Sequence, residues 1–238
     1  MGRTTGDWLF RHRGVLPVAL LPAVAWAVSR PAPPLGGDRG WQAACLAVSL
    51  AGLALRAWTV GTAPAGTSGR NTGRQIAERL NTTGPYSLVR NPLYLGNALM
   101  WCGLVVYTRS ALLSLGVALC FALLYVPIVR TEEAFLRDRF GAAFETWAAR
   151  TPAIVPRLRG FTPAALPFSP RNVLRREYSG FAALLVLFGA EVVARASATL
   201  GALALDPLGA ALMACAGAVY VTLRSLKHHT RLLHVEGR

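Results

Sequence analysis

The chain has 238 residues, of which 53% are hydrophobic and only 15% charged, yet lysine and arginine outnumber aspartate and glutamate by 25 to 11. Because soluble domains carry charge on about a quarter of their residues, this chain lacks the polar surface of an ordinary soluble domain. A formal charge of +14 suits nucleic-acid binding only where the cations form a patch of their own, and here they lie between apolar runs. The composition therefore indicates an integral membrane protein and no nucleic-acid partner.

Six apolar runs follow one another along the chain and predict its spans. They cover residues 14–29, 41–60, 93–108, 111–129, 179–197 and 203–223. A membrane-crossing helix needs about 17–25 mostly apolar residues, so the first and third runs are short enough to form tilted or broken spans. Continuous apolar runs, in place of strict alternation, exclude a membrane barrel. We therefore predict an all-α integral membrane protein with about six transmembrane helices in a single membrane domain, residues 1–238.

The distribution of the cations predicts the orientation of these spans. If the N-terminus is cytoplasmic, 21 of the 25 lysines and arginines fall in cytoplasmic segments, counting Arg56 near the cytoplasmic end of its span, and the outside keeps only Arg30, Arg39, Arg109 and Arg195. Such a bias is the positive-inside rule, and it predicts that both termini are cytoplasmic. An alternative is a cleaved leader ending near Ala25-Trp26-Ala27, which would leave an odd number of spans.

Two predicted cytoplasmic connectors, 61–92 and 130–178, are longer than a turn requires. The first is rich in glycine and asparagine and predicts a loop with one short helical piece at 74–80. In the second, Leu136, Phe140, Phe144 and Trp147 fall at helical spacing on one face. This pattern predicts an amphipathic cytoplasmic helix after the fourth span, lying along the membrane surface or under the bundle.

Polar residues in these two connectors are predicted to converge. Residues 84–96 read GPYSLVRNPLYLG, in which Pro92 suits the first turn of a helix and Arg90 lies beside its free N–H groups. The third and fourth spans form a hairpin, which returns Glu132 and Glu133 to the face that the chain left. We expect an anion site and two carboxylates on opposite sides of one ligand pocket, or alternatively an arginine–glutamate pair that locks the hairpin. The converging residues are Arg90, Asn91, Tyr94, Glu132 and Glu133.

These two blocks resemble the isoprenylcysteine carboxyl methyltransferase and phospholipid methyltransferase superfamily. The first block runs from Gly84-Pro85-Tyr86 to Gly96, and the second runs from Glu132-Glu133 to Val155-Pro156-Arg157. The resemblance implies a methyltransferase-like core over 70–160 that binds S-adenosylmethionine at the cytoplasmic membrane face without a Rossmann domain. Asn91 stands where the family usually has histidine, so a role that needs an imidazole is not implied. The implied cofactor-binding residues are Tyr86, Arg90, Asn91, Pro92, Tyr94, Leu95, Gly96, Glu132, Glu133 and Arg157.

The resemblance also implies a reaction, with Glu132, Glu133 and Arg90 as its catalytic candidates. A methyl group would move from S-adenosylmethionine to a membrane lipid or lipophilic small molecule through its carboxylate, thiol or headgroup. Since no histidine or cysteine lies in the predicted pocket, an acceptor that is already anionic is mildly favoured. We expect the enzyme in a prokaryotic inner membrane with its active site facing the cytoplasm. The alternatives are an NADPH-dependent sterol-type membrane reductase and a small transporter, whose charges would lie within the spans.

Outside the core, residues 178–238 predict an additional C-terminal helix hairpin without a counterpart in the family. In it, Glu191 and Arg195 stand four apart, the spacing of an ion pair on a helix, and we expect that pair to be structural. All four cysteines fall in apolar runs, with no two at metal-ligand spacing, so no metal site is predicted.

Overall fold

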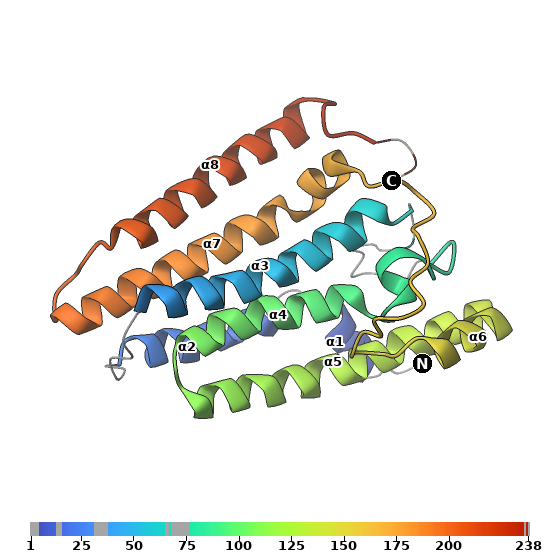
Figure 1. Cartoon of the computed structure of the whole chain (residues 1–238), viewed down its shortest axis with the longest axis horizontal. Coiled ribbons are helices and arrows are strands. Elements are labelled where there is room, and N and C mark those ends of the chain that lie inside the picture. The colour runs from blue at the N-terminus through green and yellow to red at the C-terminus, as the bar shows by residue number, and fades with distance from the viewer. Residues whose placement is uncertain are drawn as a thin grey trace.

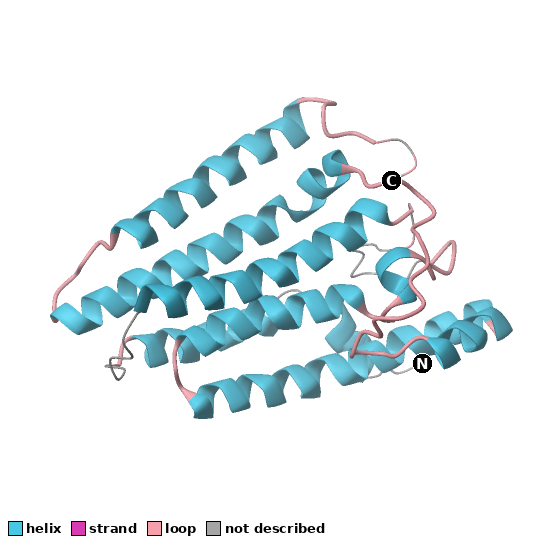
Figure 2. Cartoon of the chain, in the orientation of Figure 1, coloured by secondary structure: helices cyan, strands magenta, loops and turns pink. Residues whose placement is uncertain are grey.

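The computed structural model describes residues 5–12, 16–30, 38–64, 67, 77–235 and 237. Every regular element in these residues is a helix (Figure 2), as the apolar runs predict. In chain order the elements are α1 (Thr5–His12), η1 (Leu16–Leu20), α2 (Leu21–Val28), α3 (Asp38–Thr62), η2 (Gly84–Ser87), α4 (Pro92–Tyr107), α5 (Ala111–Phe140), α6 (Ala142–Arg150), α7 (Pro170–Leu200) and α8 (Pro207–His229).

Four of these helices, α3, α5, α7 and α8, are long and apolar enough to cross a membrane. The apolar stretch Val18–Val28 and helix α4 are shorter, in keeping with the two short runs of the sequence. Large apolar side chains on α5 face outward, with Leu112 82% and Leu115 70% exposed. Since water would penalise such a surface, the long helices indicate an integral membrane protein with lipid-facing sides.

Close approach of two backbones joins α3 to α4, which lie side by side in Figure 1. A Cβ atom on Gly52 would lie 2.5 Å from the carbonyl oxygen of Gly96, and a Cβ on Gly103 would lie 2.3 Å from that of Cys45. The Ser49 hydroxyl donates to the Met100 carbonyl at 2.8 Å. Small residues allow this contact because membrane helices associate largely through packing, and it fixes the register of α3 against α4.

Helix α5 continues without interruption past Pro127 and through Glu132 and Glu133. It ends at Gly141, whose φ of +49° lies in the region that favours glycine, and α6 starts directly after it. The single amphipathic helix predicted from Leu136 to Trp147 is therefore wrong, because Gly141 divides it into the end of α5 and the separate helix α6. An exposed ion pair between Arg137 and Glu145 bridges the two pieces, and exposed pairs of this kind contribute little to stability.

The connectors gather at one end of the bundle, where α3 ends and both α4 and α7 begin (Figure 1). The segment 151–169, here called the strap, runs along η2 and back to α3. Its Thr162 carbonyl accepts from the Gly84 N–H at 2.9 Å, and its Ser169 N–H donates to the Gly61 carbonyl at 2.9 Å. These bonds fix the loop that carries the first sequence block against the strap that carries the end of the second.

The short helix predicted at 74–80 lies partly outside the described residues, and its described part, 77–80, forms bends. The carboxamide oxygen of Asn81 accepts from the Thr83 N–H at 3.4 Å. Side chains of this kind compete with helical hydrogen bonding by bonding the nearby backbone, so the chain turns here towards η2.

Candidate functional site

The first block enters the bundle at the start of α4. Pro92 occupies the first turn of the helix, and Asn91 is its N-cap residue. An N-cap asparagine commonly bonds its own helix, but this carboxamide instead donates to the Ala153 carbonyl of the strap at 3.1 Å and to Glu133 at 3.4 Å. Asn91 therefore ties α4 to the strap and to α5.

Arg90 makes the strongest polar contacts in this region. Its Nε and Nη2 atoms donate to the two carboxylate oxygens of Glu133 at 2.9 and 3.3 Å, and Nη1 donates to the Ala148 carbonyl of α6 at 3.0 Å. Paired N–H donors that face two carboxylate oxygens form the most specific ion-pair geometry in proteins. The expected open anion site is thus occupied by Glu133, and Arg90 joins the first block to both α5 and α6.

Tyr94 and Glu132 form a second contact one turn further along. The Tyr94 hydroxyl donates to Glu132 Oε1 at 2.8 Å. The structure therefore brings together all five residues that the sequence predicted to converge. They meet in direct contacts, with Glu133 accepting from Arg90 and Asn91 and with Glu132 accepting from Tyr94, and not as opposite walls of one pocket. We call these five the signature cluster: Arg90, Asn91, Tyr94, Glu132 and Glu133.

A cavity of about 680 Å³ lies between η2, α6 and the strap, and no residue of the signature cluster is among its lining residues. It is largely open to the surface, so it would enclose a bound molecule only in part. The wall of α6 separates it from Arg90, since Trp147 and Arg150 face the cavity from the helix that Arg90 contacts through Ala148. Polar and aromatic lining residues include Ser87, Thr146, Trp147, Arg150, Arg157 and Thr162.

Two other predicted residues, Tyr86 and Arg157, belong to the frame of this cavity. The Tyr86 carbonyl accepts from Trp147 Nε1 at 3.0 Å, while burial raises the pKa of the Tyr86 phenol above its ordinary range. The Arg157 side chain donates to the Ser87 carbonyl at 3.3 Å and to the Arg150 carbonyl, and its backbone N–H donates to Leu88 at 3.0 Å. Arg157 thus fastens the strap to η2 at the cavity wall.

The remaining predicted residues support the site without reaching the cavity. Pro92 is fully buried, and Leu95 is partly buried. A Cβ on Gly96 would lie 2.5 Å from Arg56 Cγ and 2.8 Å from the Gly52 carbonyl oxygen. Gly96 therefore permits the packing of α3 against α4, and nothing places it against a ligand.

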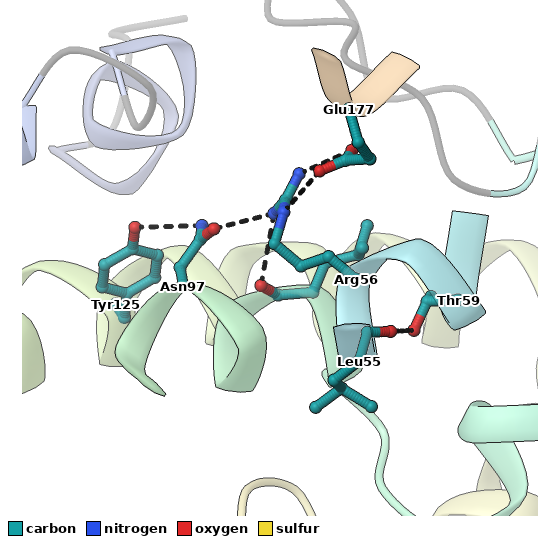
Figure 3. Close-up of polar contacts among 7 residues, drawn as sticks. Leu55, Arg56, Thr59, Asn97, Tyr125 and Glu177 are labelled. Carbon is teal, nitrogen blue, oxygen red and sulfur yellow. Dashed lines mark hydrogen bonds and ion pairs between the residues drawn. The ribbon is translucent and has the colours of Figure 1, made fainter. Parts of the chain in front are cut away.

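The sequence analysis missed a buried polar cluster next to Gly96. Arg56 of α3 pairs with Glu177 of α7 and contacts Asn97 of α4, which in turn contacts Tyr125 of α5 (Figure 3). One signal was available, because Arg56 is a single cation inside the apolar run 41–60, and an ionisable residue within a span is a functional candidate by default.

The ion pair predicted between Glu191 and Arg195 does not form. Arg195 donates instead to the carbonyls of Arg30 and Thr108 at 3.1 and 3.0 Å. Both carbonyls lie just beyond the ends of α2 and α4, where backbone acceptors lack helical partners. Neither carboxylate oxygen of Glu191 has a hydrogen-bond partner among the described residues.

Fold and site together define the class: a helical membrane protein with a polar site and an adjoining cavity at one end of its bundle. Comparison with known proteins matches part of this chain to a known family. Residues 43–143 match the phospholipid methyltransferase family, and this region includes the whole signature cluster. The resemblance seen in the sequence is thereby confirmed for this part of the chain, which is similar to a family of membrane methyltransferases.

Two curated relatives are similar to part of the chain. The cobalt-zinc-cadmium resistance protein CzcN of Cupriavidus metallidurans is 48% identical over 79 residues, covering 33% of this chain and 36% of the relative. The nickel-cobalt-cadmium resistance protein NccN of Alcaligenes xylosoxydans xylosoxydans is 44% identical over 90 residues, covering 38% and 41%. The matched segment thus spans about two fifths or less of each relative, and no solved structure matches the chain.

Proposed function

We propose that this chain is an S-adenosylmethionine-dependent methyltransferase that methylates a lipophilic acceptor at the cytoplasmic face of a prokaryotic inner membrane. One observation carries the proposal: residues about forty apart in the family region, Arg90 with Glu133 and Tyr94 with Glu132, meet in direct contacts beside a cavity. Six spans, with both termini on the cytoplasmic side, belong to the same proposal.

The cavity suits the proposed cofactor by the chemistry of its lining. Trp147 offers an aromatic surface for adenine, and the hydroxyls of Thr146 and Thr162 suit ribose. The buried Ser87 hydroxyl instead bonds the Gly84 carbonyl and the Thr162 N–H.

Arg150 and Arg157 suit a carboxylate. Glu132, which accepts from Tyr94 and lies outside the cavity lining, is the carboxylate proposed for an ammonium group. S-adenosylmethionine, when bound, would supply an electrophilic methyl group on a positively charged sulfur that can leave with the bonding pair.

The chain's own residues would then align the reactants and exclude water, which are the main requirements of an in-line displacement. Arg90 and Asn91 hold α4, α5, α6 and the strap together behind the α6 wall of the cavity. An amine or hydroxyl acceptor must lose a proton, and Glu132 or Glu133 would accept it. A thiolate or carboxylate acceptor needs no base, and the absence of histidine and cysteine from the described cavity lining favours that class.

The names of the two relatives concern metal resistance, and the described residues do not extend that to a site here. Within them no group of three or more histidine, cysteine, aspartate or glutamate side chains could hold a metal ion. The proposed methyltransferase activity rests on the family match and the signature cluster.

Equilibrium binding of radiolabelled S-adenosylmethionine to the purified protein in detergent tests the proposal. The parent protein is expected to bind, and Arg90→Ala and Glu132→Ala are expected to bind about tenfold or more weakly. Arg224→Ala on α8, whose side chain contacts the exposed Tyr220, is the matched control and should bind as the parent does. No binding by the parent, or equal binding by all four proteins, would falsify the assignment.

A second measurement addresses the acceptor. The enzyme is incubated with native-membrane lipids and cofactor labelled on its methyl group, and the labelled product is identified after extraction into organic solvent. Label in a lipid or other lipophilic product supports the proposal, whereas label confined to small soluble products contradicts the lipophilic acceptor.

A further inference from the structure

A polar cluster that no family block contains lies buried among four helices. Arg56 donates to Glu177 twice, from Nε to Oε2 at 2.8 Å and from Nη2 to Oε1 at 2.9 Å (Figure 3). Its remaining nitrogen, Nη1, donates to Asn97 Oδ1 at 2.7 Å and to the Leu93 carbonyl at 3.5 Å. Every nitrogen of this guanidinium is therefore committed to a partner on α4 or α7.

This cluster is expensive to bury. The side chains of Arg56 and Glu177 are only 15% and 5% exposed, and both stand on helices that are apolar enough to cross a membrane. Taking two charges out of water costs about as much as their attraction returns, and apolar replacements of such pairs are often at least as stable. Stability alone therefore gives a poor account of this pair.

The contacts of Arg56 determine how Asn97 is oriented. A guanidinium can only donate, so the Asn97 oxygen must face Arg56 and its NH₂ group must point the other way. That group donates to the Tyr125 hydroxyl at 3.4 Å. Replacing the donor at position 56 by an acceptor would reverse the carboxamide and remove this contact.

Tyr125 carries the connection to the signature cluster. Its ring meets the edge of the Tyr94 ring with centroids 5.0 Å apart, and Tyr94 is the residue whose hydroxyl donates to Glu132 at 2.8 Å. An unbroken series of contacts therefore leads from Glu177 through Arg56, Asn97 and Tyr125 to Tyr94 and Glu132. Glu177 lies on α7, outside the matched family region 43–143.

We propose that Arg56 and Glu177 are positioning residues that orient Tyr94 and Glu132 through Asn97 and Tyr125, so that the C-terminal hairpin completes the methyltransferase site. This inference rests on the proposed function, because it assigns Tyr94 and Glu132 to the cofactor. It makes α7 part of the working enzyme, although α7 carries none of the family's sequence blocks.

The test compares two double variants with the parent, by thermal unfolding in detergent and by the Kd for radiolabelled S-adenosylmethionine. R56M/E177M removes both charges, and the charge-exchanged R56E/E177R restores an ion pair while presenting an acceptor to Asn97. Both are expected to unfold within a few degrees of the parent and to bind the cofactor about tenfold more weakly. A merely structural pair predicts the opposite for R56E/E177R, namely parental binding once the ion pair is restored.

Matched controls and a minimal variant keep the test decisive. R137M/E145M removes an exposed arginine–glutamate pair between α5 and α6 and should bind as the parent does. Tyr125→Phe removes only the hydroxyl that Asn97 contacts and keeps the ring against Tyr94, so it is expected to bind about threefold more weakly even if both double variants fail to fold. Parental affinity in folded R56E/E177R, or in Tyr125→Phe, overturns the inference, while absence of binding by the parent overturns the proposed function instead.

Discussion

The two ends of the bundle treat their arginines and glutamates differently. At the end that carries the signature cluster, Arg90 meets Glu133 although 43 residues separate them. At the opposite end, Glu191 and Arg195 stand four apart on one helix and do not pair, because Arg195 bonds the carbonyls at the ends of α2 and α4. Glu191 remains buried with both oxygens unpartnered among the described residues.

Competition for donors explains this difference. The carbonyls of Arg30 and Thr108 follow helix ends and lack helical donors. Arg195 donates to both of these carbonyls instead of pairing with Glu191. At the signature cluster, the carbonyl of Ala148 takes one nitrogen of Arg90 and leaves two for the carboxylate. Spacing along one helix is thus a weaker guide to ion pairing than the demand of nearby backbone groups.

Replacing the glutamate at the signature end gives the largest expected effect on stability. Glu133→Leu removes the carboxylate and leaves two nitrogens of the partly buried Arg90 without it, which should lower the free energy of unfolding by about 1.5–3 kcal/mol. Thermal unfolding in detergent measures the change. Glu145→Leu, at the exposed pair with Arg137, is the control and should change stability by less than about 0.5 kcal/mol. Equal effects of the two substitutions would show that burial of the Arg90 pair is energetically unimportant.

The same substitution at the opposite end should have the opposite sign. Glu191→Leu removes two buried acceptors without partners and replaces them with an apolar group, so we expect a gain of about 1 kcal/mol. Glu191→Gln keeps a polar group at the site and should give no such gain. A loss of stability in Glu191→Leu, seen in the same unfolding assay, would mean that Glu191 interacts favourably with its surroundings and would remove the contrast between the two ends.

The smallest expected effect concerns pH and the phenol of Tyr86 at the signature end. Burial raises its pKa in the folded protein, whereas an unfolded tyrosine titrates near pH 10. Above about pH 10 the folded state therefore binds more protons than the unfolded state, so stability falls as pH rises. In Tyr86→Phe this part of the loss is absent, and its unfolding midpoint should decline less steeply than the parent's between about pH 9.5 and 11. Parallel declines would indicate that Tyr86 is accessible to solvent.

Much of the fold could be predicted because apolar run length reports directly on helices that face lipid. The runs 41–60, 111–129, 179–197 and 203–223 correspond to the four helices that are long enough to span a membrane. The ends of these helices could not be predicted, because hydropathy does not indicate where a helix ends once it has left the apolar layer. Helix α5 accordingly extends beyond its run to Phe140, and the positive φ of Gly141, not composition, ends it.

Convergence at the site was predictable for a topological reason: a tight hairpin returns α5 to the face where α4 began. The pairing of side chains within the site was not predictable. Whether Arg90 contacts Glu133, the Ala148 carbonyl or a ligand depends on distances that only the folded structure sets. The ion pair between Arg56 and Glu177 was not predicted for the same reason. The two residues are 121 positions apart in the sequence, and neither belongs to a recognisable block. Whether the site binds S-adenosylmethionine stays a prediction until binding is measured.

The close contact between α3 and α4 bears on how mutational data for this chain should be interpreted. Gly52, Gly96 and Gly103 tolerate no added carbon without displacing backbone or a neighbouring side chain, so a saturation scan would rank them as intolerant as Arg90 or Glu132. Gly96 even stands inside the first family block, where intolerance would be taken as a sign of ligand contact. Sensitivity to substitution therefore mixes two causes in this block, and only a readout that separates folding from binding distinguishes the glycine from its chemically active neighbours.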